Sequence, residues 1–186
     1  MSERRATIAG YRGPLDCIGP DRLDALDATE EWVAEEKYDG CWARVVVRGG
    51  VIAEVVSRAG LDLDPAWAWP GVDLGVRVAC VLHGEAMDDG ALHLWDLVER
   101  DGEDLRGLAL EMRREALRRL YASTPSRVRA DLHMVDQRAT GFRTYYDQVM
   151  ARGGEGLVLK RRGSTLLTRR RDGKLAAWLK IKISNR

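Results

Sequence analysis

Short apolar runs, separated by turn-forming residues, are the feature that most constrains how this chain can fold. Glycine pairs or Asp-Gly close several of them, at Gly49-Gly50, Asp89-Gly90 and Gly153-Gly154. Runs of this length between tight turns are typical of antiparallel strands. The predicted strands lie within 32–38, 41–47, 51–57, 78–87, 91–98, 132–137, 155–161 and 175–184. They favour an α+β fold built on antiparallel sheets.

Two segments have the pattern of helices instead. In LALEMRREALRRLY, at 108–121, apolar side chains recur at helical spacing. The predicted inner face consists of Leu108, Met112, Ala116, Leu117 and Leu120. Two pairs are expected to face water, Glu111 with Arg114 and Glu115 with Arg119. A second helix is predicted from Phe142 to a glycine stop at Gly153 or Gly154.

The composition indicates an intracellular domain. The segment 62–71 is expected to be a loop, and no repeat or linker divides the sequence, so residues 1–186 are expected to form one domain. Cys17, Cys41 and Cys80 are too scattered for a disulfide framework or a zinc ribbon. Without an apolar run suited to a signal peptide or membrane span, we expect a cytoplasmic monomer with no membrane partner.

Charge is distributed unevenly along the chain. Residues 160–186 carry ten Lys or Arg and one acid, or +9, whereas the net charge of the whole chain is +1. The preceding 159 residues therefore carry −8. This asymmetry favours a nucleotide or polyanion partner for the C-terminal part, although a solvated basic tail is the plainer alternative.

The stretch EEKYDG, at 35–40, places a lysine where a hairpin does not require one. Asp39 and Gly40 suit a type I′ turn. On a strand through Trp32 to Tyr38, Glu35 and Lys37 would share a face about 6–7 Å apart. A surface hairpin with a solvated ion pair and a lysine tuned by its neighbours both fit these six residues.

Six stretches decide between these alternatives, because they follow the order found in covalent nucleotidyltransferases. They are KYDG at 37–40, SRAG at 57–60, LHGEAM at 82–87, LHLWDLVERDGEDLRGLALEMRREAL at 92–117, EGLVLK at 155–160 and WLKIK at 178–182. Each is a weak motif alone, but six in order are specific. The fourth is most similar to ATP-dependent DNA ligases. The chain thus resembles the adenylation domain of that family, an antiparallel-sheet, ATP-grasp-like nucleotidyltransferase fold.

The resemblance implies an enzyme that uses ATP and Mg²⁺ or Mn²⁺. Lys37 is expected to attack the α-phosphate of ATP, giving a lysyl-adenylate and pyrophosphate. Because an ammonium cannot attack, its site must favour the neutral amine through burial or nearby cations. Lys180 and Lys182 alternate with apolar residues, so both project from one strand face, and by resemblance they hold the α-phosphate.

The resemblance gives further roles to six residues. Glu85 and Glu155 would bind the divalent ion, and Glu85 would also reach the ribose. Trp95 would stack on adenine. Glu35 would contact the adenine amino group, although surface exposure is an equal alternative. Arg58 would contact nucleic-acid phosphate. Arg44 lies two residues after Trp42 on the same strand face, so it would reach the same phosphate.

Three departures from the family pattern are visible. Trp42 stands where DNA ligases usually have an arginine, and His83 where relatives usually have an aspartate. His83 is expected either to bond locally on the face of Glu85 or to be a structural histidine. Relatives also continue into an OB domain after WLKIK, whereas this sequence stops at Arg186, which leaves room for a protein partner that replaces the missing domain.

These features predict an ATP-dependent polynucleotide ligase, with DNA favoured and a place in DNA repair. It would transfer AMP from Lys37 to a 5′-phosphate and seal that end to a 3′-hydroxyl. An RNA ligase or a capping-type nucleotidyltransferase is the alternative enzyme. A nucleotide-binding or DNA-end-binding module that does not seal is the alternative of another class.

The run Arg169, Arg170 and Arg171 is expected to contact the phosphate backbone of nucleic acid. Changing all three to Ala should weaken binding to duplex DNA of any sequence, because counterion release is lost. The slope of log K against log salt should flatten by about 0.9 for each phosphate contact removed. Fluorescence anisotropy across a salt series measures this slope. An unchanged slope would identify the run as a solvated loop.

Overall fold

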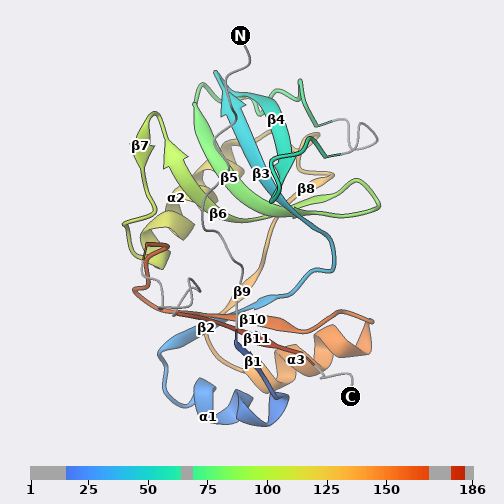
Figure 1. Ribbon diagram of the computed structural model, residues 1–186, viewed down its shortest axis with the longest axis vertical. Coiled ribbons are helices and arrows are strands. Elements are labelled where there is room, and N and C mark those ends of the chain that lie inside the picture. The colour runs from blue at the N-terminus through green and yellow to red at the C-terminus, as the bar shows by residue number, and fades with distance from the viewer. Residues whose placement is uncertain (1–15, 64–68, 168–176, 183–186) are drawn as a thin grey trace. The chain divides into compact units, whose positions relative to one another are not determined.

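The computed structural model describes residues 16–63, 69–167 and 177–182, which form two compact units (Figure 1). The six-stranded unit consists of Gly40–Arg106 and Met112–Met134. The five-stranded unit consists of the described parts of Arg12–Asp39, Gly107–Glu111 and Val135–Arg186. Each unit is described by itself, and the expectation of a single domain stays a prediction.

The five-stranded unit contains a mixed sheet in the order β1-β11-β10-β2-β9. Only β1 and β11 run parallel; the other neighbours are antiparallel. Its strands are β1 (Asp16–Ile18), β2 (Trp32–Glu36), β9 (Gln137–Arg138), β10 (Leu157–Arg161) and β11 (Trp178–Ile181). Its helices are η1 (Pro20–Arg22), α1 (Leu23–Asp27) and α3 (Phe142–Ala151). The glycine stop of α3 is confirmed, because Gly153 has a φ of 82° just beyond the helix.

One face of this sheet is covered by α1 and α3 (Figure 1). Because side chains alternate along a strand, every second residue of β2, β10 and β11 points into this core. The buried cluster consists of Leu23, Ala34, Phe142, Tyr145, Tyr146, Val149, Leu157, Leu159 and Ile181. The intervening residues belong to the opposite face of the sheet, which carries the charged side chains described below.

The six-stranded unit contains a sheet in the order β4-β3-β5-β6-β7, with β8 paired in parallel to β6. Its strands are β3 (Cys41–Arg48), β4 (Val51–Ser57), β5 (Cys80–Ala86), β6 (Leu92–Arg100), β7 (Glu103–Asp104) and β8 (Leu132–Met134). The predicted turns at Gly49-Gly50 and Asp89-Gly90 are confirmed, since each joins consecutive antiparallel strands. Gly50 and Gly90 have φ values of 93° and 91°, which favour glycine.

The predicted hairpin at Asp39 and Gly40 is wrong. Strands β2 and β3 belong to different sheets and do not pair, and Gly40 does not have a positive φ. Glycine is needed there for another reason: a Cβ at Gly40 would lie 2.5 Å from the carbonyl oxygen of Ala86. The boundary between the two units falls between Asp39 and Gly40.

Helix α2 (Leu110–Ser123) confirms the predicted helix and the burial of Leu117 and Leu120 on its inner face, but not the burial of Met112. Met112 is 57% exposed, whereas Arg113 is fully buried. Arg113 donates from Nε and Nη2 to the two carboxylate oxygens of Asp96 on β6, at 2.9 and 3.0 Å. A hydrophobicity pattern cannot predict an arginine neutralised in this way. The predicted exposed pair of Glu115 with Arg119 is confirmed, at 2.7 Å.

No helix in the described part of the chain is long and apolar enough to cross a membrane.

Replacing Arg113 with Ala should destabilise the protein by about 3–5 kcal/mol, because Asp96 would remain as a buried, unpaired charge. Arg118→Ala, on the same helix, removes an ion pair whose side chains are 58% and 42% exposed, and should have a much smaller effect because water screens the pair. Urea unfolding followed by circular dichroism measures both. Equal losses of unfolding free energy in the two variants would contradict a special role for the buried pair of Asp96 and Arg113.

Candidate active site

The face of the five-stranded sheet opposite α1 and α3 carries the predicted reactive residues. Strand pairing places Gln137 beside Glu35, Glu35 beside Val158, and Val158 beside Lys180. Residues opposite each other on neighbouring strands share a face, so these four form one row across β9, β2, β10 and β11. The next row contains Lys160 beside Trp178.

Lys37 lies at one end of this face, directly after β2. Its backbone N–H donates to the carbonyl oxygen of Gly156 at 2.9 Å, which ties the end of β2 to the start of β10. Its Nζ donates to Oε2 of Glu155. Lys182 Nζ lies 3.6 Å from the other oxygen, Oε1. The structure therefore brings Lys37, Glu155 and Lys182 together.

Lys180 belongs to the same group of charges. Burial lowers the pKa of Lys180, and the positive charges of Lys37 and Lys182 lower it further, while Glu155 opposes the shift. Three cations and one carboxylate thus concentrate positive charge at this end of the sheet. Such a cluster can bind a phosphate and stabilise charge that develops on it.

The glycines beside the two predicted metal-binding glutamates serve strand packing. A Cβ at Gly156 would lie 2.0 Å from the carbonyl oxygen of Ile181 on β11. At Gly84 it would lie 2.6 Å from the carbonyl oxygen of His93 on β6. Glycine at both positions therefore allows close approach between neighbouring strands.

Glu35 is buried rather than surface-exposed, with 2% of its area accessible. Its Oε2 lies 2.5 Å from Nζ of Lys160, and its Oε1 accepts a hydrogen bond of 3.0 Å from the Gln137 amide. The Lys160 ammonium also lies 4.3 Å from the centre of the Trp178 ring, a cation–π contact. Sequence analysis missed Lys160, Gln137 and Trp178. The available signals were that Lys160 ends the EGLVLK stretch and that Trp178 begins the WLKIK stretch.

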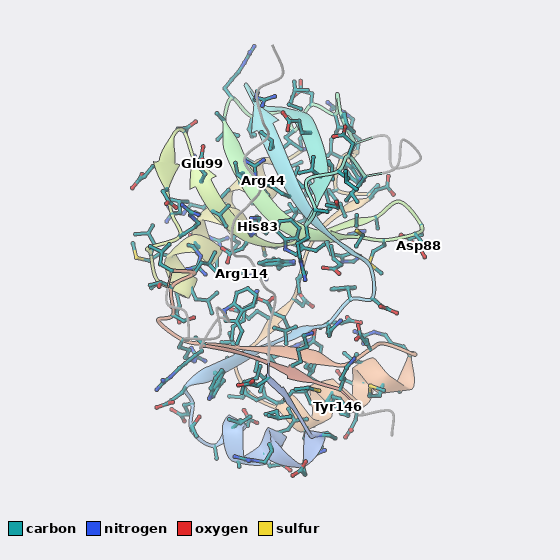
Figure 2. The ribbon with its side chains drawn as sticks, viewed as in Figure 1. Arg44, His83, Asp88, Glu99, Arg114 and Tyr146 are labelled. Carbon is teal, nitrogen blue, oxygen red and sulfur yellow. The ribbon has the colours of Figure 1, made fainter. Side chains whose placement is uncertain are left out.

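The six-stranded unit holds a second group of predicted residues. Arg44 lies opposite His83 and Trp42 opposite Glu85 in the pairing of β3 with β5, so all four share a face of the sheet. Figure 2 shows Arg44 and His83 on these neighbouring strands. Burial raises the pKa of the Cys41 thiol; Glu85 adds to the rise and Arg58 opposes it.

An aromatic cluster centres on His83, which is 5% exposed. Its ring packs edge-on against Trp42 at 5.0 Å and against Trp95 at 5.4 Å between centroids. Trp42 is itself buried, at 7% exposure. The position where ligases usually carry an arginine is therefore part of an aromatic core in this chain, and Arg44 is the nearby cation on the same face.

Other predicted roles are not tested by these contacts. Arg169, Arg170 and Arg171 lie outside the described residues. Among the described residues, no three His, Cys, Asp or Glu side chains cluster in a way that could hold a metal ion. Glu85 and Glu155 belong to different units, so their joint binding of a divalent ion stays a prediction.

A comparison with protein families assigns the chain to one of them. Residues 80–182 match the family described as the ATP dependent DNA ligase domain. This match covers more than half of the 186 residues, so the chain belongs to that family. Comparison with curated proteins gave no match.

Solved structures show the same fold. The ligase domain of ligase D from M. tuberculosis has 21% identity and a TM-score of 0.66, covering 91% of this chain and 60% of that one. A mycobacterial DNA ligase D complexed with ATP has 22% identity and a TM-score of 0.61, covering 82% and 54%. Chlorella virus DNA ligase-adenylate has 15% identity and a TM-score of 0.58, covering 91% and 67%.

The chain thus spans between about half and two thirds of these ligases. Its fold is the α+β nucleotidyltransferase fold of their adenylation domain, and the fold prediction is confirmed.

The pKa of Lys180 should respond to its neighbours with a defined sign. Glu155→Gln removes the stronger of the two influences that raise it, the other being Cys17, so the pKa should fall further; Lys182→Met removes a repelling cation, so it should rise. Glu31→Gln, whose carboxylate pairs with Arg161 on the same sheet, should leave it unchanged. Carbon-detected NMR titration of lysine Cε atoms measures all three. Shifts of the same sign in the first two variants would contradict the proposed cluster.

Proposed function

We propose that this chain forms a covalent adenylate on Lys37 from ATP and transfers the AMP to the 5′-phosphate of a DNA end for sealing. The observation that carries the proposal is the cluster of Lys37, Glu155, Lys180 and Lys182 on one sheet face. It lies in a chain of the ATP-dependent DNA ligase family.

The first step follows from the chemistry of an amine and a phosphoanhydride. Lys37 must leave its contact with Glu155 and lose a proton, because only the lone pair of Nζ can attack. A bond forms between Nζ and the α-phosphorus, and the bond from that phosphorus to the bridging oxygen breaks. Pyrophosphate leaves with the electron pair. Lys180 and Lys182 are suited to bind the α-phosphate oxygens as their charge changes.

A divalent ion fits the carboxylates available. Mg²⁺ binds in proteins through one or two carboxylates together with substrate phosphates, and carboxylate oxygens are its preferred ligands. Glu155 lies at the reactive lysine, with 23% of its side chain exposed. Glu155 and Glu85 are the residues we propose to hold the ion. When bound, it would neutralise phosphate charge during the transfer.

The second and third steps complete the proposal. The 5′-phosphate of a DNA end would attack the phosphorus of the lysyl-adenylate, which frees Lys37 and leaves AMP joined to the end. A 3′-hydroxyl would then attack that end and expel AMP. Arg44 and Arg58 are the cations of the six-stranded unit proposed to contact the nucleic acid.

Incubation with α-labelled ATP and Mg²⁺ or Mn²⁺ should give a label that survives denaturation and is released by acid, as expected of a phosphoramidate. Lys37→Arg should abolish it, because the guanidinium keeps its charge but cannot act as the nucleophile. Lys182→Met should slow labelling by about 10²–10³ if a phosphate-stabilising charge is lost. Arg161→Ala, an exposed residue of β10, is the matched control and should label normally.

A chase of the isolated adduct shows which polymer, DNA or RNA, accepts the AMP. A chase with 5′-phosphorylated nicked DNA should transfer the label to the DNA strand, whereas an RNA end should remain unlabelled. A label that moves only to RNA would favour an RNA ligase. An adduct formed with GTP alone would favour a capping-type enzyme. No adduct under any ion or pH would sink the proposal and leave a binding module.

A further inference from the structure

The residue just before Lys37 makes its contacts on the other face of the five-stranded sheet. Glu36 lies opposite Leu157 in the pairing of β2 with β10, and Leu157 belongs to the core that α3 covers. Because side chains alternate along a strand, Glu36 lies on the face opposite to the lysine cluster. The reaction proposed above uses no residue of this helix-covered face.

The Glu36 carboxylate holds the C-terminal end of α3. Its Oε2 accepts a hydrogen bond of 2.5 Å from Nη2 of Arg152, the C-cap residue of this helix. Its Oε1 lies close to Gly154, where an added Cβ would be only 3.2 Å from that oxygen. Gly154 directly precedes Glu155, which accepts a hydrogen bond from Lys37. The two segments that carry Lys37 and Glu155 are therefore joined on both faces of the sheet.

Two tyrosines complete the contacts of Glu36. Burial raises the pKa of the Tyr38 hydroxyl, and the charge of Glu36 and a hydrogen bond to its side chain raise that pKa further. Tyr38 therefore stays protonated at neutral pH and donates to Glu36. Burial also raises the pKa of Tyr145 on α3, whereas a hydrogen bond from the backbone of Glu36 opposes the rise. Both neighbours of Lys37 in the chain thus belong to one set of contacts with α3.

The ion pair between Glu36 and Arg152 is of a kind that adds little to stability. The side chain of Arg152 is 51% exposed and that of Glu36 12%, and water screens a pair that it can reach. Its place beside the reactive lysine gives the pair another use. Attack on phosphorus requires aligned reacting atoms, and a misplacement of about 1 Å can lower a rate about 10²-fold.

We propose that Glu36, Tyr38 and Arg152 are positioning residues for the adenylation step, which hold the backbone of Lys37 in register while its side chain exchanges Glu155 for the α-phosphate of ATP. The contact between Lys37 and Glu155 is lost in that exchange. The contacts of Glu36 lie on the other face of the sheet and do not depend on it. The inference rests on the proposed function, because it concerns how the same lysine is aimed.

The test follows single-turnover labelling of Lys37 by α-labelled ATP over a range of ATP concentrations. Glu36→Ala and Arg152→Met should lower the maximal labelling rate about tenfold through misalignment, with a smaller loss in Tyr38→Phe. The ATP concentration that gives half the maximal rate should stay near the wild-type value. Arg152→Lys, which keeps the charge, should recover part of the rate. The double variant of Glu36→Ala and Arg152→Met should be no slower than either single variant, because both remove the same contact.

Arg143→Met is the matched control. Arg143 also lies on α3 and pairs with Asp24 at 3.3 Å, but this contact ties the helix to a segment without a proposed reactive residue. Its maximal labelling rate should equal that of wild type. Urea unfolding followed by circular dichroism should give Arg143→Met and Arg152→Met similar stabilities. If Arg152→Met fails to fold, Tyr38→Phe and Arg152→Lys still report the effect on the rate.

Each outcome decides the inference. Folded variants that label at the wild-type maximal rate would overturn it and leave the proposed function intact. Slowing that ATP at high concentration fully restores would show a role in ATP binding and would also overturn it, as would equal slowing by Arg143→Met. Wild type that labels at no ATP concentration would overturn the proposed function, and this inference with it.

Discussion

Alternation of side chains across the five-stranded sheet is the constraint on which the candidate site depends. Leu157, Leu159 and Ile181 point into the core with α1 and α3, and this packing fixes the strands. The residues between them must then lie on the other face, where Lys160 and Lys180 are found. A one-residue slip of β11 would bury its lysines and expose its apolar anchors, so the packing of the core sets the positions of the charges.

Two buried ion pairs serve this protein in different ways. Asp96 and Arg113 join β6 to α2 with both partners essentially inaccessible, so their interaction is structural. Glu35 and Lys160 are nearly as deeply buried, but they lie on the sheet face that carries Lys37 and Lys180. In a low-dielectric setting both pairs are costly to break.

The two side-chain departures from the ligase pattern are a single structural feature. Trp42 and His83 are far apart in the sequence, yet their rings are in contact, and the ring of Trp95 also packs edge-on against the histidine. An arginine at position 42 would place a charge in this buried aromatic cluster and would need a partner that His83 does not obviously provide. The structure thus places both positions in one aromatic cluster.

The sequence alone predicted most of the strands, the glycine turns at Gly49-Gly50 and Asp89-Gly90 and both longer helices, because these depend on local periodicity. Motifs read in order also singled out the lysines that the structure brings together at the end of β2. The tertiary structure decided what depends on contacts between distant segments. Asp39-Gly40 looks like a hairpin locally, but β2 pairs with strands far along the chain. Met112 was predicted to be buried, but Arg113 is buried instead, because Asp96 neutralises its charge. Glu35 is buried because Gln137, 102 positions away, and Lys160 both reach it. Local sequence specifies backbone geometry, whereas the protonation, burial and partners of a charged group are set by residues that only folding brings near.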